Sequence, residues 1–414
     1  MSEYMDFFAR LARETAERKR EFLELGRIAG RFPAADTAHH GEISIWCSND
    51  YLGMGQHPDV LAAMKRAVDE CGAGSGGSRN IGGTNRYHVA LEAELASLHR
   101  KEDAVLFTSG YSANEGALSV LAGRIDDCAV FSDQLNHASI IDGLRHSGAE
   151  KFIYRHNDCA HLEELLSGVD PQRPKLVVTE SVHSMRGDIA PLAEIADIAK
   201  RYGAVTFVDE VHAVGMYGPE GAGIAAQEGL APAFTMVMAT LAKGFGMTGG
   251  YVAGPTVLMD AVRAFARSFI FTTALPPAVA AGALTAVRHL RSSQRERERL
   301  AANAALMHGL LRERRIPFLS DQTHIVSVLV GEDRLCKTMS ALLLERHGAY
   351  VQAINAPSVP TGEEILRVAP SAVHEAADVR RFVDALDGIW AELGVARKCP
   401  GDGAVGMPDP VTPA

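Results

Sequence analysis

Cysteine is scarce in this sequence, and its placement is not that of a metal-binding or disulfide-rich protein. Six cysteines are scattered over 414 residues, without a Cys-x-x-Cys pair. This pattern predicts reduced thiols buried in a cytoplasmic protein, and it predicts no metal site.

Long apolar runs and an excess of basic residues are missing as well. No stretch reaches the roughly 18 apolar residues that a membrane span needs. The N-terminus is rich in Arg and Glu and lacks the apolar core of a signal peptide. The net charge of −10 disfavours binding to nucleic acid. We therefore expect neither a membrane nor a nucleic acid as partner.

Short apolar runs that alternate with helical patterns are plentiful, and they predict an α/β fold. The apolar runs cover residues 104–108, 129–133, 175–179, 204–208 and 234–239. The helical patterns between them cover residues 140–148, 161–166 and 192–202. Strands that alternate with helices are typical of a mostly parallel sheet covered on both faces.

Hydrophobic periodicity also predicts the domain organisation. Residues 1–32 read as an amphipathic helix, residues 43–46 as a strand, and residues 278–313 as one long helix between domains. Past that helix we expect a smaller α/β unit with strands over 325–330 and 350–353 and helices over 336–345 and 377–393. The predicted domains are an N-terminal helical arm (1–45), a large domain (46–290), a small domain (291–395) and a disordered tail (396–414).

Lys243 is the residue around which a functional site is predicted. It follows the apolar run 234–239 and precedes a run of small residues. An amine in such a pocket is desolvated, so its pKa falls and more of it is neutral at pH 7. Neutral lysine amines form Schiff bases with aldehydes, and pyridoxal phosphate (PLP) is such an aldehyde. Taken alone, a lysine is more commonly a solvated surface charge.

Asp209 turns this weak signal into a prediction of a PLP site. It ends the apolar run 204–208, so it lies at the end of a predicted strand, as Lys243 does. PLP accepts electrons only while its ring nitrogen stays protonated, and a buried carboxylate beside that nitrogen holds the proton there. Ligands bind at the carboxyl ends of strands in open α/β sheets.

Other predicted strands end in polar residues that suit the same cofactor. Ser109, Gly110 and Tyr111 open a helix after a strand, where free N–H groups favour a phosphate, although an ordinary helix cap is the alternative. His137 follows the next strand, where an imidazole can stack on a ring or transfer a proton, although a surface histidine is the alternative. The glycine-rich segment 72–84 carries Arg79 and Asn80, which favour a binding loop over a flexible linker.

Several of these motifs resemble those of the α-oxoamine synthases, a family of PLP-dependent enzymes. The resemblance covers residues 40–393 and is strongest in the segments 46–58 (WCSNDYLGMGQHP), 74–81 (GSGGSRNI), 135–139 (LNHAS), 208–218 (VDEVHAVGMYG) and 240–243 (TLAK). It implies fold type I of the PLP-dependent transferases, which is the aspartate-aminotransferase-like fold. It also implies a homodimer with active sites at the subunit interface.

The activity that the resemblance implies is an acyl transfer. Glycine and succinyl-CoA would condense to 5-aminolevulinate, CoA and CO2, a step in tetrapyrrole and heme biosynthesis. Lys243 would hold PLP and remove a proton from glycine, and Asp209 would keep the pyridine nitrogen charged. His137 would stack on the ring, and His212 would bond the phenolic oxygen. The cofactor residues implied are Ser109, Gly110, Tyr111, His137, Glu180, Ser184, Asp209, His212, Thr240, Lys243, and Thr272 and Thr273 of the partner subunit.

The resemblance also implies substrate contacts. Arg367 would bind the glycine carboxylate, because a guanidinium pairs well with a carboxylate. Arg20 and Asn80, beside Arg79, would hold the succinyl carboxylate, and Ser132 and Lys151 would contact CoA. The full set is Arg20, Asn49, Ser78, Asn80, Ser132, Lys151, Ser358 and Arg367.

Some residues depart from the family's pattern. Ser78, Gly82 and Ser358 stand where Thr, Ser and Thr are usual, and His183 and Arg186 stand where Tyr and Asp are usual. A changed methyl group in a pocket is worth only about 1–3 kcal/mol of discrimination. An α-oxoamine synthase with a different acyl-CoA or amino acid therefore stays as the alternative function. A non-catalytic scaffold is a further alternative, and the intact Lys243 argues against it.

Overall fold

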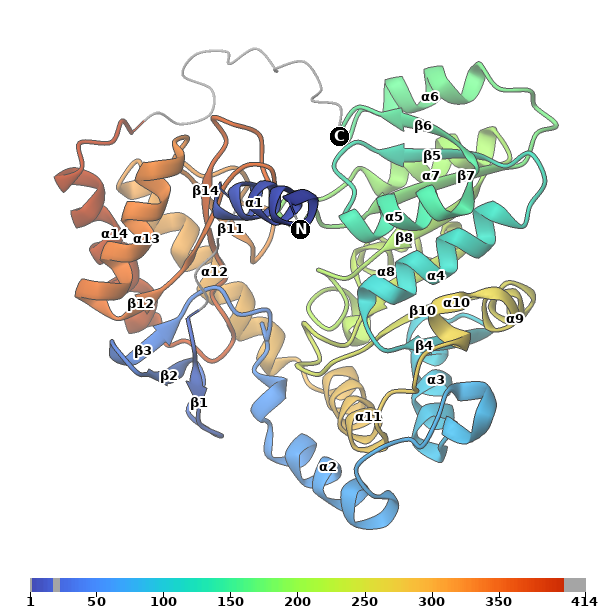
Figure 1. Ribbon diagram of the computed structural model, residues 1–414, viewed down its shortest axis with the longest axis horizontal. Coiled ribbons are helices and arrows are strands. Elements are labelled where there is room, and N and C mark those ends of the chain that lie inside the picture. The colour runs from blue at the N-terminus through green and yellow to red at the C-terminus, as the bar shows by residue number, and fades with distance from the viewer. Residues whose placement is uncertain (1, 18–22, 398–414) are drawn as a thin grey trace.

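The chain folds into two lobes, and the first is built on a seven-stranded sheet (Figure 1). A computed structural model describes residues 2–17 and 23–397. Neighbouring strands of the sheet follow the order β4 (Asp103–Phe107), β10 (Gly250–Gly254), β9 (Met236–Thr240), β8 (Val205–Asp209), β7 (Lys175–Glu180), β5 (Ala129–Asp133) and β6 (Glu150–Tyr154). Strand β10 runs antiparallel to both of its neighbours, and the other pairings are parallel. The predicted α/β fold with a mostly parallel sheet is therefore confirmed.

Helices cover both faces of this sheet, because successive side chains of each strand point to opposite faces. Within β5, Val130 packs in one apolar cluster and Phe131 in another. One face is covered by α4 (Gly110–Gly123), α5 (Ala138–Ser147), α9 (Thr256–Phe265) and α10 (Arg267–Ile270). The other face is covered by α3 (Arg86–His99) and α11 (Pro277–Ser292) at one end and by α6 (Cys159–Ser167), α7 (Leu192–Arg201) and α8 (Ile224–Gln227) at the other.

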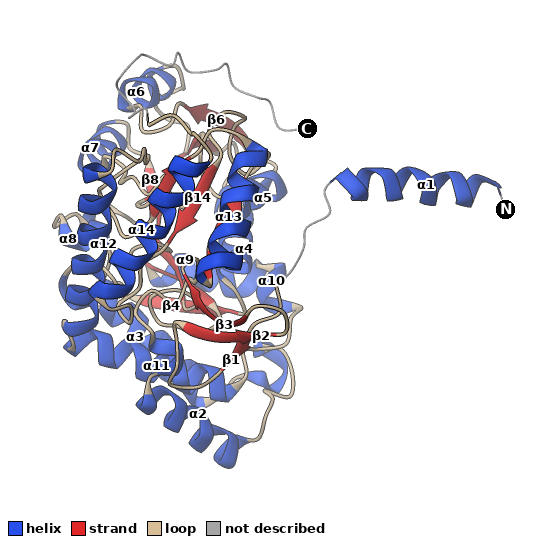
Figure 2. Ribbon diagram, turned by 90° about the vertical axis from the view of Figure 1, so that its left-hand side faces the viewer, coloured by secondary structure: helices blue, strands red, loops and turns tan. Residues whose placement is uncertain are grey.

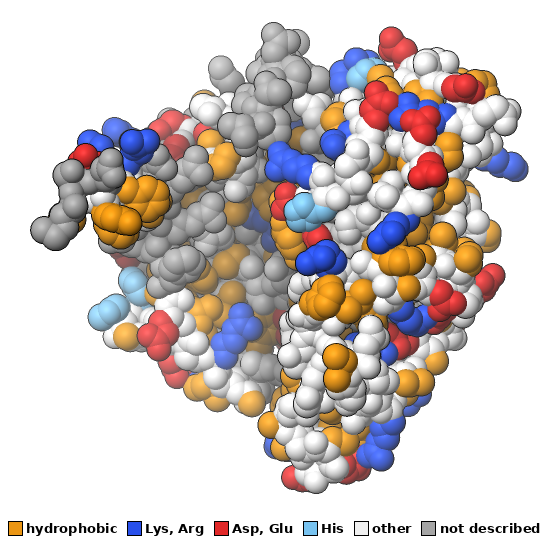
Figure 3. All heavy atoms as spheres, turned by 45° about the vertical axis from the view of Figure 1, so that its right-hand side comes forward, with side chains coloured by type: hydrophobic (Ala, Val, Ile, Leu, Met, Phe, Trp, Pro, Cys, Tyr) orange, Lys and Arg blue, Asp and Glu red, His pale blue; other side chains and the backbone are white. Residues whose placement is uncertain are grey.

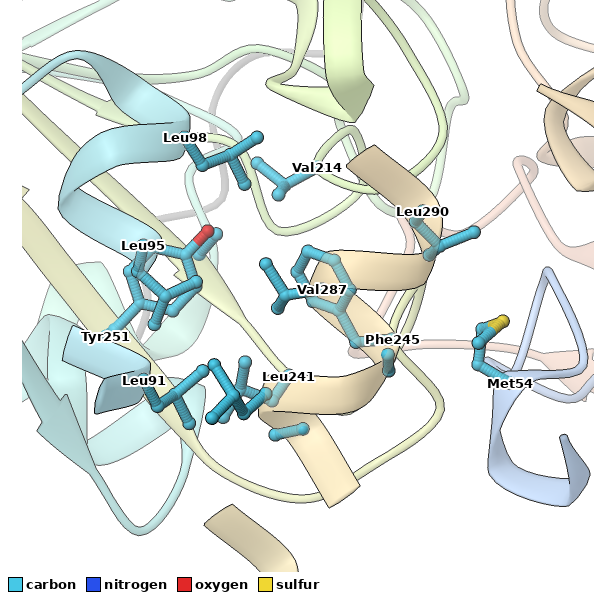
Figure 4. Packing of buried hydrophobic residues seen from close by; sticks show 14 of the residues in the cluster. Met54, Leu91, Leu95, Leu98, Val214, Leu241, Phe245, Tyr251, Val287 and Leu290 are labelled. Carbon is cyan, nitrogen blue, oxygen red and sulfur yellow. The ribbon is translucent and has the colours of Figure 1, made fainter. Parts of the chain in front are cut away.

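The cluster between α3, α11 and the sheet anchors the segment that carries Lys243. Leu241 and Phe245, two residues to either side of Lys243, are fully buried in this cluster. Figure 4 shows both side chains among those of α3 and α11, with Tyr251 of β10 beside them. Apolar burial therefore fixes the backbone around a residue whose own side chain is polar.

The second lobe combines the two ends of the described chain. Strands β11 (Val326–Leu329), β14 (Ile365–Val368) and β13 (Gln352–Ile354) form one sheet, which packs with α12 (Arg295–Glu313), α13 (Asp333–His347) and α14 (Ala376–Glu392). A second sheet has the order β1 (Gly26–Arg27), β2 (Ala34–Thr37), β3 (Gly41–Ile45) and β12 (Ala349–Tyr350). We propose that the smaller domain contains residues 26–45 as well as 291–395, because β3 pairs with β12.

Two helices and four helical turns complete the described elements. Helix α1 (Ser2–Glu17) stands away from the body of the molecule (Figure 2), and α2 (Pro58–Cys71) packs against α11. The helical turns are η1 (Met54–Gln56), η2 (Arg79–Gly83), η3 (Pro219–Gly221) and η4 (Ala231–Ala233). Among the described residues, no helix has the length and the apolar character that crossing a bilayer requires.

Three predicted elements differ in the structure. The helix expected over 1–32 ends at Glu17 in the described residues, and β1 begins at Gly26. The helix expected over 278–313 is two helices, α11 and α12, separated at Ser293, whose backbone is extended. Arg297 of α12 donates to the carbonyl of Leu290 at 2.6 Å and so caps the last turn of α11 in place of a continued helix. The strand expected over 350–353 is divided between β12 and β13, which belong to different sheets.

Candidate active site

The polar residues singled out in the sequence meet at one edge of the central sheet. Ser109, His137, Glu180, Asp209 and Thr240 lie at or just after the ends of β4, β5, β7, β8 and β9. These strands are mutually parallel, so their carboxyl ends share that edge. Lys243 and His212 follow Thr240 and Asp209 within three residues. Figure 3 shows the molecule hollowed where the two lobes meet, with basic and histidine side chains at the rim.

Lys243 lies against His212, and its charge is disfavoured there. The Lys243 Nζ is 2.8 Å from the His212 Nε2. Burial and the positive charge of Arg367 lower the pKa of Lys243 to about 7, although the carboxyl groups of Asp209 and Glu180 raise it. A substantial part of this amine is therefore neutral at pH 7 and able to react with an aldehyde.

A chain of hydrogen bonds determines which nitrogen of His212 carries its proton. Burial and the charge of Lys243 lower the pKa of His212 well below its ordinary value, so the ring is neutral. Its Nδ1 is 3.2 Å from the Tyr51 hydroxyl, which donates to the Asn49 Oδ1 at 3.0 Å and accepts from the Arg367 Nη2 at 3.1 Å. Because the Tyr51 proton is used toward Asn49, His212 donates from Nδ1. Its Nε2 is then the acceptor that faces Lys243.

Asp209 is a buried carboxylate that can accept further hydrogen bonds. It is 3% exposed, and its Oδ2 accepts from the Asn114 Nδ2 at 2.7 Å while its Oδ1 accepts from the Val211 N–H at 2.8 Å. Burial raises the pKa of Asp209, and these hydrogen bonds and the charge of Lys243 oppose that rise. Each oxygen of a carboxylate can accept two hydrogen bonds, so Asp209 can still accept one from a protonated ring nitrogen.

Glu180 is the register partner of Asp209 on the adjacent strand β7. Burial, and then the neighbouring charge of Asp209, raise the pKa of Glu180 well above its ordinary value. Glu180 also accepts from the backbone N–H of His137. We infer that Glu180 is the protonated member of the pair and that Asp209 carries the charge, because Asp209 accepts two hydrogen bonds and Glu180 accepts one.

The first turn of α4 is an anion site beside these groups. Ser109 caps the helix, with its Oγ accepting from the Ser112 N–H at 3.0 Å. The first N–H groups of a helix have no partner within it, and the helix dipole adds a partial positive charge. A Cβ atom on Gly110 would lie 3.2 Å from the Thr240 side chain, so glycine keeps this turn close to β9.

These features fit PLP. The site offers an amine of low pKa for the aldehyde, a buried carboxylate with a free lone pair for the ring nitrogen, and a helix N-terminus for the phosphate. The exposed ring of His137 lies at the same edge, with its Nδ1 2.8 Å from the Ser139 Oγ. Lys243, Asp209, Ser109, Gly110 and Thr240 would hold the cofactor.

Other predicted site residues lie close to this centre. Arg367 is buried, and its Nε donates to the Ser184 carbonyl at 2.9 Å, which places Ser184 beside it. Ser132 is buried and accepts from the Asn136 Nδ2 at 2.9 Å, so its hydroxyl is engaged inside the protein. The Tyr111 hydroxyl donates to Asp142.

The remaining predicted residues are not brought to the centre by contacts within this chain. Ser78 pairs with Thr273 in an isolated antiparallel bridge, and Thr272 lies next to it. Asn80 and Ser358 are exposed, and so is Lys151, whose Nζ donates to the Ala149 carbonyl at 3.2 Å. Arg20 lies outside the described residues.

Arg79, which the family resemblance places at the succinyl carboxylate, has its charge compensated inside the chain. Its Nη1 and Nη2 donate to the two oxygens of Glu92 at 2.8 and 2.9 Å, and both side chains are largely buried. A guanidinium in such a bidentate pair is not a free cation for a ligand carboxylate.

Four residues of the site were missed as functional residues. Tyr51 and Asn114 bond His212 and Asp209, as described. The Tyr217 hydroxyl is 2.8 Å from the His324 Nδ1, and the His324 ring stacks edge-on against Tyr51, with 4.2 Å between centroids. Two of the four, Tyr51 and Tyr217, lie within family motifs quoted from the sequence, and that placement could have indicated a functional role. Asn114 on α4 and His324 in the other lobe gave no such signal.

Comparison with known proteins agrees with this geometry. A family model described as "Aminotransferase class I and II" matches residues 42–386. The 5-aminolevulinate synthase 2 of Cereibacter sphaeroides is 54% identical over 385 residues, which cover 92% of this chain and 94% of that protein. The 5-aminolevulinate synthase of Rhizobium meliloti is 53% identical, with 92% and 95% covered. The chain belongs to the 5-aminolevulinate synthases, within the class I and II aminotransferase family.

Solved structures show that this 5-aminolevulinate synthase family shares its fold with serine palmitoyltransferases. The enzyme from S. paucimobilis, solved with PLP and myriocin bound, is 32% identical, with a TM-score of 0.87 and coverage of 95% of this chain and 98% of that one. The enzyme from Sphingomonas wittichii is 31% identical, with the same TM-score and coverage. The predicted PLP-dependent transferase fold and the cofactor are thus confirmed.

In this member of the 5-aminolevulinate synthases, Gly246 shapes the turn that presents Lys243. Its φ is +64°, and its N–H donates to the Lys243 carbonyl at 2.9 Å. A Cβ atom there would lie 2.1 Å from the backbone nitrogen of Gly55. We expect Gly246→Ala to lower the free energy of unfolding by about 2–5 kcal/mol, from left-handed strain and overpacking together. Urea unfolding, followed by circular dichroism, measures this.

Gly309 provides the matched control. It lies in α12 with no atom within 4 Å of an added Cβ, so Gly309→Ala should raise the free energy of unfolding by about 0.5–1 kcal/mol. Equal stability of the two variants would show that the turn at residue 246 tolerates a side chain.

Proposed function

We propose that this protein condenses glycine with succinyl-CoA to give 5-aminolevulinate, CoA and CO2. The observation that carries the proposal is the part-buried Lys243–His212 contact beside Asp209, in a chain about half identical to proteins named 5-aminolevulinate synthase. PLP, when bound, supplies an electron sink that stabilises negative charge at the α-carbon of an amino acid.

Lys243 is the base in this proposal. Because its pKa is about 7, its amine is available at neutral pH to take a proton from the glycine α-carbon and to return one later. The neutral Nε2 of His212 accepts a hydrogen bond from that amine and directs it. Asp209 keeps a negative charge at the end of the neighbouring strand β8, which favours a protonated ring nitrogen.

Arg367 is the group for the glycine carboxylate. It is buried, and burial together with its positive charge lowers the pKa of Lys243. Its Nε and Nη2 are held by the Ser184 carbonyl and the Tyr51 hydroxyl. A guanidinium has five N–H donors, so others stay available for a carboxylate.

We further propose a homodimer in which each subunit completes the site of its partner. Ile81, which follows Asn80, is 81% exposed, and Phe271, which precedes Thr272, is 74% exposed. They are two of the most exposed large apolar side chains among the described residues. Exposed apolar side chains in neighbouring segments are typical of a protein interface. Thr272, Thr273, Ser78 and Asn80 would reach the partner's PLP and acyl pocket from there.

The free cysteines of the described residues are consistent with the expected cytoplasmic location.

The experiment is an assay of the purified PLP-bound protein with glycine and a panel of acyl-CoA donors. The panel contains succinyl-, glutaryl-, butyryl- and palmitoyl-CoA, and serine replaces glycine in a parallel series because the structural relatives are serine palmitoyltransferases. We expect kcat/KM to be highest for glycine with succinyl-CoA. Butyryl-CoA is the matched control, since it has the same carbon chain length without the second carboxylate. A higher kcat/KM with butyryl- or palmitoyl-CoA would overturn the proposed donor.

A further inference from the structure

A second group of titratable side chains lies outside the PLP site. Asp133 ends β5, His156 follows β6, and His183 and Asp188 lie in the loop after β7. Three neighbouring parallel strands of the sheet edge, β6, β5 and β7, therefore bring these residues together from separate parts of the sequence. None of the four has been given a role in the reaction.

His183 is the residue that needs an explanation. It is 2% exposed, yet neither of its ring nitrogens has a hydrogen-bond partner among the described residues. A buried polar atom without a partner costs about 1–3 kcal/mol. Its neighbour His156 is satisfied, because its Nδ1 bonds Asp133 and its Nε2 bonds Asp188, each at 3.0 Å. A protonated His156 between two carboxylates thus accounts for Asp133 and for the Oδ2 of Asp188, but it leaves both nitrogens of His183 and the Oδ1 of Asp188 without a partner among the described residues.

The inner atoms of the group have the spacing of metal ligands. The Asp133 Oδ1 is 3.0 Å from the His156 Nδ1 and 3.8 Å from the His183 Nε2, and the three atoms lie within 4.8 Å of one another. Ligand atoms around a tetrahedral zinc ion, each at about 2.0–2.2 Å from it, lie about 3.3–3.6 Å apart. Small side-chain rotations would bring all three atoms to a common ion.

Asp188 supplies the outer support that such a site requires. Its Oδ2 is 3.0 Å from the His156 Nε2, and its Oδ1 is 3.7 Å from the His183 Nδ1. One carboxylate therefore faces the outer nitrogens of both imidazoles. Histidine ligands almost always donate their second N–H to a carboxylate or carbonyl, which fixes the ring and increases its basicity.

We propose that Asp133, His156 and His183 bind a divalent transition-metal ion, with zinc as the ion that fits their chemistry. Two imidazole nitrogens and one carboxylate oxygen are ligands suited to zinc, and water fills the fourth position. The ion would fix the loop that carries Ser184, whose carbonyl holds Arg367. The site adds a structural metal to the proposed function and does not depend on which acyl-CoA the enzyme uses.

A second histidine cluster serves as the internal control. His57, Asp59 and His289 also lie close together, but Asp59 is largely exposed, and the His57 Nδ1 already accepts from the Asp59 N–H at 3.3 Å. In this cluster no buried nitrogen lacks a partner among the described residues. We expect no stoichiometric binding of metal there.

The test is a zinc titration of the PLP-bound protein after dialysis against a chelator, in competition with a chromophoric zinc indicator. We expect one zinc ion per chain. His183→Gln should weaken the affinity by at least about 100-fold, and Asp188→Asn by about 10- to 100-fold. His289→Gln should leave it unchanged. Circular dichroism and the PLP absorbance spectrum check that each variant is folded, and His183→Tyr is the second ligand variant if His183→Gln is not.

Crystals of the holoenzyme soaked in zinc chloride locate the ion independently. An anomalous peak at the zinc edge, between Asp133, His156 and His183, is expected. Full-strength binding in both His183 variants, loss of binding in His289→Gln, a peak at a cysteine, or no stoichiometric uptake would each overturn the proposal.

Discussion

Lys243→Ala is expected to lower kcat by at least about 10⁴-fold, which is the upper range of what a positioned proton-transfer group contributes. The variant removes an amine whose pKa is about 7, and with it the group in hydrogen-bond contact with His212. It should also abolish the covalent attachment of PLP to the chain. Treatment of the wild-type holoenzyme with borohydride, followed by peptide mass spectrometry, should find PLP on the peptide that contains residue 243.

Lys337 is the matched control for this variant. It is an exposed lysine on α13, where it pairs with Asp333 four residues before it. Surface pairs of this kind contribute about 0.3–0.5 kcal/mol, so Lys337→Ala should leave kcat and PLP attachment unchanged. Covalent PLP in Lys243→Ala, or residual activity within tenfold of the wild type, would show that another amine attaches PLP or transfers the proton.

The predictable part of the site is the part that local sequence dictates. An apolar run followed by a polar residue marks the end of a buried strand, and parallel strands bring such ends together, so Asp209, Lys243 and His137 were placed correctly at one edge. The lowered pKa of Lys243 and the raised pKa of Asp209 also follow from burial at that edge. Each of these inferences needs only a few neighbouring residues.

The missed part depends on contacts between distant segments. Tyr51 reaches His212 across 161 positions, and Arg367 reaches Tyr51 across 316. Tyr51 follows β3, which pairs with β12, so the segment before the first lobe is joined to the second lobe by a contact between distant parts of the chain. The break between α11 and α12 is a separate and local case, since its capping side chain, Arg297, comes from the first turn of the following helix. Neither proline nor glycine marks that break.

The metal-ligand cluster illustrates the same limit. The cysteines show no metal-ligand spacing in the sequence, whereas Asp133, His156 and His183 lie at or just after the ends of three strands. A sheet edge brings together residues more than twenty positions apart, so a spacing rule cannot find them. In the proposed site the fold, and not a local motif, supplies the geometry.

Asp209→Asn is expected to lower kcat by about 10²- to 10³-fold, the range observed when one preorganised electrostatic partner of a reaction is removed. The change keeps the size of the side chain and removes its charge, so the chain no longer favours a protonated ring nitrogen. The fold should tolerate it, because the Asn114 Oδ1 has no hydrogen-bond partner among the described residues. If the Asn114 amide flips, that oxygen accepts from the new amide, and Ser139, now 3.0 Å from the Asn114 Nδ2, can donate to the same oxygen.

Glu210, the next residue, provides the matched control for Asp209. Its substitution also removes a buried carboxylate, but one that is not expected to face the cofactor. It is fully buried and accepts from the Ser181 Oγ at 2.6 Å and from the N–H groups of Ile224 and Ala225 at 3.0 and 2.8 Å. Glu210→Gln should therefore lower the free energy of unfolding by about 1–3 kcal/mol and change kcat less than twofold. Steady-state kinetics and urea unfolding of both variants measure the two effects. If Asp209→Asn instead lost stability and kept its kcat, Asp209 would be a structural carboxylate, and the charge that PLP chemistry requires would have to come from Glu180.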